Sequence, residues 1–355
     1  MKIKTILFSA ILTLAGPAFA QTVLTYSDHE PYGNMRTRFI NDVFFKNVET
    51  ESNGRIKIEA HWGGEIATAH KEFEAIEEKR TDLIVAVPEY NEKRLPLHQL
   101  FKSFLIGPSG NKQVETLRQI YQDIPELTAE YEANGVKPVM IATGYPVAFF
   151  SVNKLDNLAQ IKGQTWRSAS FWHRDFLKNA GATPTTSRWG QETYDKLANG
   201  EMHGLMVNID SAIDIKAYEH TPYALVSKQM WLGHIYPVVI SLDRWNSLNE
   251  QDRKAFERAA EKSYGELGAI MDSNYTEMLK KARLLGVTVR ELSDDEVREW
   301  GKTSQYLQVQ QDWANAKEQE GVANVQSVLE KLRNHIGEVR RSNHLKTLLQ
   351  NLFKK

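Results

Sequence analysis

Short runs with the periodicity of β-strands alternate with amphipathic helical stretches along most of this chain of 355 residues. Residues 55–60 alternate charged and apolar side chains, the period-two pattern of a half-buried strand. The apolar run at 83–87 is unbroken, which is typical of a strand covered on both faces. Apolar residues between 39 and 48 recur at helical spacing. This alternation predicts an α/β fold.

The alternation of predicted strands and helices continues toward the C-terminus. Further strands are expected at 23–26, 139–142, 147–152, 204–208 and 237–242, and helices at 68–80, 112–134, 171–180, 194–198 and 249–285. Ser293 begins a capping box that predicts a helix running toward residue 320. The chain has no Pro/Gly/Ser-rich linker, so any domains are expected to be closely connected by strands that cross between them.

Residues 1–20 have the composition of a signal peptide. Lys2 and Lys4 precede a short apolar stretch at 6–16, and small residues allow cleavage after Ala20. The stretch is shorter than the roughly 20 residues that a helix needs to span a bilayer. Without the two lysines, 42 basic residues face 45 acidic ones, a formal charge of −3. We therefore expect an exported protein of a bacterial periplasm.

The sequence also excludes several kinds of chemistry. It has no cysteine, and its ten histidines include no pair closer than nine residues, which excludes thiolate sites and the i, i+4 histidine pair of many metal sites. Gly301-Lys302-Thr303 is similar to the end of a phosphate-binding loop, but Glu296 stands where the first glycine is needed. The nearly neutral charge, with no basic block, gives no electrostatic footprint for nucleic acid. We expect no enzyme, cofactor, metal or nucleic-acid partner; a secreted hydrolase or lyase with an unrecognised site is the alternative.

A series of short motifs lies in a fixed order along the chain. The most specific is the segment 158–167, LAQIKGQTWR, which is followed by Gly181-Ala182-Thr183-Pro184. The others are Ser52-Asn53-Gly54-Arg55-Ile56, Gly63-Gly64, Thr81-Asp82-Leu83, Leu95-Pro96, Glu192-Thr193-Tyr194, Asn199-Gly200-Glu201-Met202-His203-Gly204 and Trp245-Asn246-Ser247-Leu248. In this order and spacing, from about residue 23 to 320, the chain resembles the periplasmic solute-binding proteins of TRAP transporters, the DctP type.

The resemblance implies a two-lobed periplasmic binding protein fold, with an interlobe cleft, crossing strands and a long connecting helix. We expect residues 21–144 and 235–274 to form lobe I, and residues 145–234 and 275–355 to form lobe II. Binding would close the lobes by hinge motion around a small organic acid. The protein would act as a monomer, perform no chemistry and deliver the acid to an integral-membrane TRAP permease. The alternative is a ligand-sensing protein that reports to a membrane receptor kinase.

The resemblance also assigns residues to the ligand site. Arg167, at a strand end, matches the selectivity arginine of the family, whose planar fork can grip a carboxylate in two parallel hydrogen bonds. The asparagine of the family aligns with Asn208, or one position earlier with Val207. The remaining candidates are His29 and Glu30 in the first loop, Tyr90 after the buried strand, the aromatic Trp189, and Tyr145, His234 and Tyr236 at the crossings between lobes.

Two positions depart from the family. Val147 stands where some members carry a second ligand arginine, and His203-Gly204 replaces an Asp-Gly turn. With one arginine available, we predict a monocarboxylate or a keto or hydroxy acid, and no binding of sugars or amines. Aromatic residues near the predicted site hint at a larger or aromatic acid; they are Tyr90, Tyr145, Trp166, Trp172 and Trp189.

The C-terminal segment extends beyond the resemblance. Residues 331–355 carry seven lysines and arginines against the single acid Glu338, and apolar residues between 345 and 353 follow helical spacing. A basic amphipathic helix at about 340–355 could lie on an anionic membrane or dock its apolar stripe on a lobe. We favour docking, because an exposed apolar stripe is unfavourable in water.

Overall fold

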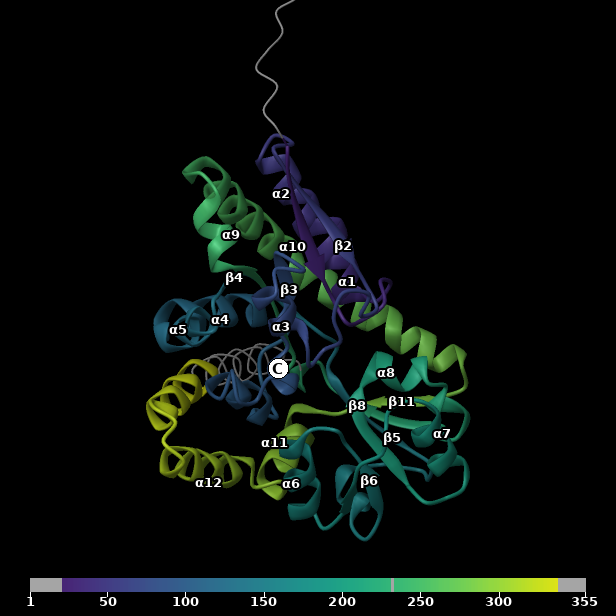
Figure 1. The fold of residues 1–355 in the computed structure, drawn as a ribbon. Helices are drawn as coiled ribbons and strands as arrows, with labels where there is room; N and C mark the ends of the chain where they lie inside the picture. Colours follow the sequence, from purple (N-terminus) through teal and green to yellow (C-terminus); the bar gives the residue numbers. More distant parts are fainter. Residues whose placement is uncertain (1–20, 231–232, 338–355) are drawn as a thin grey trace, which may run out of the picture.

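The computed structural model describes residues 21–230 and 233–337, which form two α/β lobes (Figure 1). Lobe I contains a five-stranded sheet in the order β2-β1-β3-β10-β4, and lobe II a six-stranded sheet in the order β11-β9-β5-β8-β6-β7. The strands of lobe I are β1 (Thr22–Ser27), β2 (Ile56–His61), β3 (Leu83–Val85), β4 (Val136–Thr143) and β10 (Ile235–Ser241). Those of lobe II are β5 (Val147–Ser151), β6 (Thr165–Arg167), β7 (Thr183–Thr185), β8 (Gly204–Asn208), β9 (Tyr223–Val226) and β11 (Thr288–Glu291). The predicted two-lobed α/β fold is confirmed.

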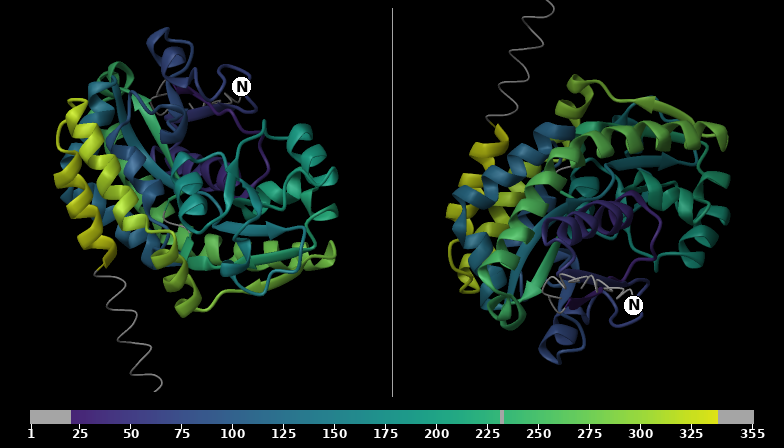
Figure 2. Two further views of the ribbon diagram at one scale, coloured as in Figure 1. Left: turned by 90° about the horizontal axis from the view of Figure 1, so that it is seen from below. Right: turned by 90° about the horizontal axis from the view of Figure 1, so that it is seen from above.

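Helices pack around both sheets, as the two views of Figure 2 show. Lobe I carries α1 (Met35–Arg38), the π-helix η1 (Phe39–Phe45), α2 (Lys46–Glu51), α3 (Glu72–Glu77), η2 (Pro88–Tyr90), η3 (Leu97–Ser103), α4 (Gly110–Asp123), α5 (Pro125–Ala133) and α9 (Leu242–Ser247). Lobe II carries η4 (Leu158–Ile161), α6 (Phe171–Asn179), α7 (Gln191–Ala198), α8 (Ile209–Asp214), η5 (Ala217–Glu219), η6 (Lys228–Met230) and α11 (Asp294–Thr303). Two further helices, α10 (Glu250–Leu284) and α12 (Tyr306–Gln319), contact elements of both lobes.

The 35-residue helix α10 is the long connecting helix that the resemblance implied. It packs on α2 and α4 of lobe I and on β11 and α8 of lobe II. Asn249 caps its first turn by accepting the Asp252 N–H, and Lys281 and Arg283 complement the dipole of its last turn. Gly268 lets α4 approach closely, because a Cβ at this position would collide with Asn111. The lobes therefore share one continuous helical connection in addition to the segments that lead from β4 to β5 and from β9 to β10.

Residues 325–337, which we had assigned to lobe II, pack instead on lobe I. They are helical, and their apolar side chains join a buried cluster with η3, α4 and α5. Residues 325–337 therefore help to cover the apolar face of η3 and α4, where Leu100 and Ile120 are both 0% exposed. The other predicted lobe boundaries stay predictions, and the predicted helix at 340–355 lies outside the described residues.

Two predicted helices are each divided in the structure. The stretch 112–134 forms α4 and α5, because Pro125, which has no N–H to donate, begins a new helix. The helix that begins at the Ser293 capping box ends at Thr303, and Gln305, with a φ of 52°, turns the chain before α12 begins. The capping box itself is confirmed, with reciprocal bonds between Ser293 and Glu296.

Candidate ligand-binding site

Strand ends from both lobes converge on one region. In lobe I, Thr143 pairs with Ile235, so β4 ends where β10 begins, and β3 ends at Val85 on the same side. In lobe II, Val147 pairs with Asn208, so β5 begins where β8 ends. Ligands of α/β proteins bind in the crevice outside the carboxyl ends of strands. The loops at these ends carry most of the predicted site residues.

Arg167 ends β6 and is only 5% exposed. Its guanidinium lies 4.7 Å from the centroid of the Trp189 ring, and one nitrogen donates to the Ser187 carbonyl oxygen at 3.1 Å. Its Nε is buried with no hydrogen-bond partner, and no carboxylate forms an ion pair with it within residues 21–230 and 233–337. Burial lowers the pKa of Arg167, and its interaction with Tyr90 opposes this shift. Arg167 is thus a buried cation for which the described part of the chain supplies no counter-ion.

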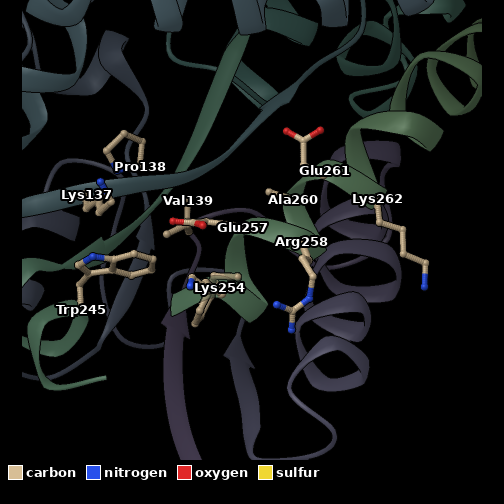
Figure 3. Close-up of a pocket in the computed structure, with 11 residues that line it drawn as sticks. Lys137, Pro138, Val139, Trp245, Lys254, Glu257, Arg258, Ala260, Glu261 and Lys262 are labelled. Atoms are coloured by element: carbon tan, nitrogen blue, oxygen red, sulfur yellow. The ribbon is translucent and has the colours of Figure 1, made fainter. Parts of the chain in front are cut away.

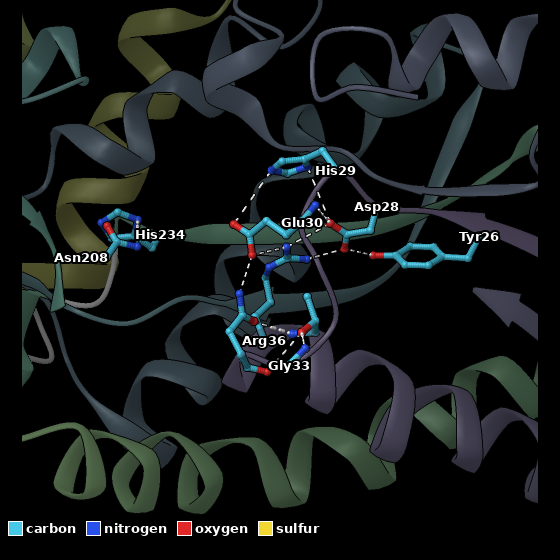
Figure 4. Close-up of polar contacts among 10 residues, drawn as sticks. Tyr26, Asp28, His29, Glu30, Gly33, Arg36, Asn208 and His234 are labelled. Carbon is cyan, nitrogen blue, oxygen red and sulfur yellow. Dashed lines mark hydrogen bonds and ion pairs between the residues drawn. The ribbon is translucent and has the colours of Figure 1, made fainter. Parts of the chain in front are cut away.

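A network of buried charges follows β1 in lobe I (Figure 4). Arg36 donates to both oxygens of Asp28, at 2.6 and 3.1 Å, and it also forms an ion pair with Glu30 Oε2 at 2.7 Å. The Tyr26 hydroxyl donates to Asp28 at 2.6 Å, and Asn34 Nδ2 donates to Glu30 at 2.6 Å. Burial disfavours the charged forms of Asp28 and Glu30, but Arg36 outweighs burial and holds both pKa values below their usual range. The network therefore fixes a charged Glu30 in the first loop.

Aromatic side chains lie beside both charged groups. The rings of His29 and Tyr90 meet edge to face at 5.3 Å, and His70 contacts the Tyr90 ring at 5.1 Å. Burial lowers the pKa of His29, although Asp28 opposes this, so the imidazole is neutral at pH 7. Tyr90 and Trp189 are 39% and 38% exposed, unusual for large rings. Exposed aromatic surface near a buried arginine suits the flat or apolar body of an organic acid.

Asn208 and His234 come together where the chain crosses between lobes. Asn208 Nδ2 lies 3.4 Å from His234 Nδ1, and Figure 4 shows this pair across from Glu30. Val207, the alternative alignment, is buried in the hydrophobic core. Between the two predicted positions, the packing therefore favours Asn208.

The two tyrosines at the crossings have different neighbours. The Arg36 guanidinium lies 4.5 Å from the centroid of the Tyr236 ring. The Tyr236 ring also lies so close to Gly144 that a Cβ at this glycine would be 2.8 Å from a ring carbon, so a side chain here would collide with the ring. The Tyr145 hydroxyl lies 3.4 Å from Asn274 Oδ1 on α10. Tyr236 thus belongs to the charged network of lobe I, whereas Tyr145 connects the crossing to the long helix.

The family model for bacterial extracellular solute-binding proteins, family 7 (DctP), matches residues 31–314. This chain belongs to that family. The resemblance seen in the motifs is confirmed, and the family is one of periplasmic, TRAP-associated binding proteins. Among curated proteins no match to the chain is found.

Solved structures share the fold. A TRAP periplasmic solute-binding protein from Desulfovibrio salexigens is 20% identical over 88% of this chain and 96% of its own, with a TM-score of 0.75. DctP7 of Bordetella pertussis, a receptor binding pyroglutamic acid, is 16% identical over 88% and 99%, with a TM-score of 0.70. A TRAP solute-binding protein from Rhodoferax ferrireducens, in complex with copurified benzoate, is 17% identical over 91% and 100%, with a TM-score of 0.74.

Sequence reasoning missed several charged residues that lie near the predicted site residues of this DctP-family protein. Asp28 directly follows β1 and could have been suspected from that position, whereas nothing in the sequence pairs it with Arg36. Asp210, on α8, and Lys102, on η3, also lie near the predicted residues and carried no signal. Such pairings depend on which loops the fold brings together.

Lys102 belongs to a polar cluster that also includes His173 and His234. It pairs with Glu89, and burial lowers the pKa of its ammonium group to about 7. Burial likewise holds the pKa values of His173 and His234 well below the usual value, with Lys102 as a further cause. Two small cavities of about 20 and 10 Å³ lie between these side chains. At most one of them is large enough for a single water molecule.

A spacious pocket of the described residues lies elsewhere (Figure 3). It has a volume of about 850 Å³ and is lined by residues of β4, α9 and α10, including Lys137, Trp245 and Phe256. None of the predicted site residues lines it. Size alone therefore does not locate the ligand site, and the buried charge without a counter-ion is the better guide.

Neither a metal site nor a membrane span is found in the part of the chain that the structure describes. Within residues 21–230 and 233–337, no three His, Asp or Glu side chains are grouped so as to hold a metal ion. No helix in these ranges is both long and apolar enough to cross a bilayer.

Proposed function

We propose that this protein captures a small carboxylic acid between its lobes, with Arg167 as the anchor, and delivers it to a TRAP-type membrane permease. The observation that carries this proposal is the Arg167 guanidinium, 5% exposed and without a carboxylate partner among the described residues. Burying an unpaired charge is unfavourable. A ligand carboxylate would complete the pair with two charge-assisted hydrogen bonds.

The surroundings of Arg167 support an acid with a flat body. Trp189 lies against the guanidinium, and Tyr90 of lobe I exposes its ring near the same cation. Structural neighbours have been solved with benzoate and with pyroglutamate, both carboxylic acids that carry a ring. The candidates His29, Glu30, Asn208, Tyr145, His234 and Tyr236 would line the rest of the cleft.

The protein would perform no chemistry of its own. Binding would hold the lobes closed and present them to the permease. We further propose that residues 1–20 are removed after Ala20 on export and that the mature protein acts as a monomer in the periplasm.

Thermal-shift screening of an organic-acid library, followed by calorimetry, tests this function. A ligand at 100 times its dissociation constant stabilises the folded state by about 2.7 kcal/mol, a shift that is easily measured. We expect monocarboxylates, keto acids or hydroxy acids to stabilise the protein, and neutral sugars to have no effect. An uncharged sugar as the best ligand would contradict the proposal.

A further inference from the structure

A largely apolar groove lies between α11 and the start of α12. It has a volume of about 410 Å³, and the buried side chains of Ile106 and Tyr306 line it together with Gly301. Leu307 lines the same groove and is 51% exposed. Apolar surface is unfavourable in water, and an apolar groove with an exposed leucine at its edge indicates that another surface covers it.

The described chain ends beside this groove. The helix at 325–337 runs antiparallel to α12, because Gln326 donates to Asn315 at 2.6 Å, whereas Arg333 donates to the Leu307 carbonyl oxygen at 2.8 Å. Gly337, the last described residue, follows Arg333 by about one helical turn, or roughly 6 Å. The chain therefore leaves the described structure near Leu307.

The segment that follows, residues 338–355, has the sequence of a basic amphipathic helix. Its apolar residues, at 345, 348, 349, 352 and 353, recur at helical spacing. Its charged residues are the bases Arg340, Arg341, Lys346, Lys354 and Lys355 and the acid Glu338. A helix of this length spans about 27 Å, which is enough to cover a groove that begins where the described chain ends.

The charges of α11 are complementary to such a segment. This helix carries the acids Asp294, Asp295, Glu296 and Glu299 and the bases Arg298 and Lys302. Both bases line the groove, and each already pairs with an acid of the same helix. The side chains of Asp295 and Glu299 are 88% and 69% exposed, so both carboxylates can also face a basic partner.

The larger groove beside β4 suits a basic segment less well. The bases that line it are Lys137, Lys254, Arg258 and Lys262, and the acids are Glu257 and Glu261. An excess of positive charge there would repel a segment with five bases and one acid.

We propose that residues 338–355 dock on the groove between α11 and α12, with their apolar stripe against Leu307 and their basic side chains near Asp295 and Glu299. The docked segment would bury Leu307 and stabilise the folded protein. None of the predicted ligand-site residues lines this groove, so the inference does not depend on the proposed function.

Disulfide trapping tests the contact directly, because the chain has no cysteine of its own. Leu307→Cys is combined in turn with Leu345→Cys, Leu348→Cys and Leu352→Cys, and the purified protein is oxidised at low concentration. Leu284→Cys replaces Leu307→Cys in the matched control, because Leu284 is a 78% exposed leucine at the end of α10, which Figure 1 shows well apart from α12.

We expect a disulfide within one chain for at least one pair with Leu307→Cys, since a bridge needs Cα atoms within about 7 Å of each other. The pairs with Leu284→Cys should stay reduced. Equal oxidation with Leu284→Cys, no disulfide with Leu307→Cys, or disulfides only between two chains would overturn the inference; the last result would identify a second copy as the occupant.

Thermal melting measures the energetic coupling between the segment and the groove. Deleting residues 340–355 should lower the melting temperature by about 2 °C or more. Leu307→Ser should lower it in the full chain and much less in the truncated chain, whereas Leu284→Ser should have the same effect in both. Equal effects of Leu307→Ser in both chains would overturn the inference. Unchanged melting on truncation, with loss of binding to vesicles of anionic phospholipid, would overturn it in favour of a membrane surface.

Discussion

Replacing Arg167 separates the ligand-binding role of this side chain from any role in stability. Arg167→Ala removes a cation that has no carboxylate partner among the described residues and is 5% exposed. Removing one member of a buried charge pair typically costs about 2–5 kcal/mol, so affinity should fall by a factor of about 30 to several thousand. The ligand-free variant should keep its stability within about 1 kcal/mol, because no protein ion pair is broken.

Arg55, an arginine that does have a carboxylate partner, provides the matched control. Arg55 lies 2.8 Å from Asp252 Oδ1, and the two side chains are 12% and 6% exposed. Arg55→Ala should therefore lower the free energy of unfolding by about 3 kcal/mol and leave affinity unchanged, the opposite of Arg167→Ala. Calorimetry for affinity and urea denaturation for stability measure both effects on both variants.

Arg167→Lys tests whether ligand binding needs the planar guanidinium or only its positive charge. It keeps the charge but replaces the planar fork with an ammonium that cannot form two parallel hydrogen bonds. We expect at least about a tenfold loss of affinity. Binding by the lysine variant within about a factor of two of the wild type would refute the bidentate role, since a charge alone would then be sufficient.

Three other outcomes are expected. Trp189→Ala removes the ring 4.7 Å from the guanidinium and should weaken binding about 3- to 30-fold with little change in melting temperature; unchanged affinity would contradict the stacking role. Burial raises the pKa of the 0% exposed Glu72 to about 8, above its unfolded value, so the folded state holds the extra proton and stability falls as pH rises from about 5 to 8. Glu72→Gln should flatten that slope by up to about 1.4 kcal/mol per pH unit in urea denaturation, and an unchanged slope would show that Glu72 ionises normally. Deleting residues 340–355 should lower the melting temperature and leave affinity unchanged; unchanged melting with lost liposome binding would favour the membrane role instead.

The sequence predicted those parts of the fold that local patterns control. Alternation at 55–60 and the unbroken run at 83–87 correspond to β2 and β3, and the uninterrupted helical pattern after Asn249 corresponds to α10. Strands β7, β9 and β11 were missed because three or four residues are too few to establish a period. Residues 325–337 were placed with the wrong lobe, since an apolar stripe does not reveal which lobe it will cover.

Only some residues of the candidate site could be predicted from the sequence, because the other contacts join loops that are distant along the chain. Arg167 was predicted through the resemblance to a family, because one arginine at a strand end carries no signal by itself. The pairings of Arg36 with Asp28 and with Glu30 depend on loops that the fold brings together. Neither can be derived from spacing along the chain.

A crystal structure of the protein with the best acid from the screen would test the central claim most directly. We expect both carboxylate oxygens of the ligand within hydrogen-bond distance of the Arg167 guanidinium, and the body of the ligand near Trp189 and Tyr90. A bound solute without a carboxylate, or an acid whose carboxylate lies away from Arg167, would contradict the claim.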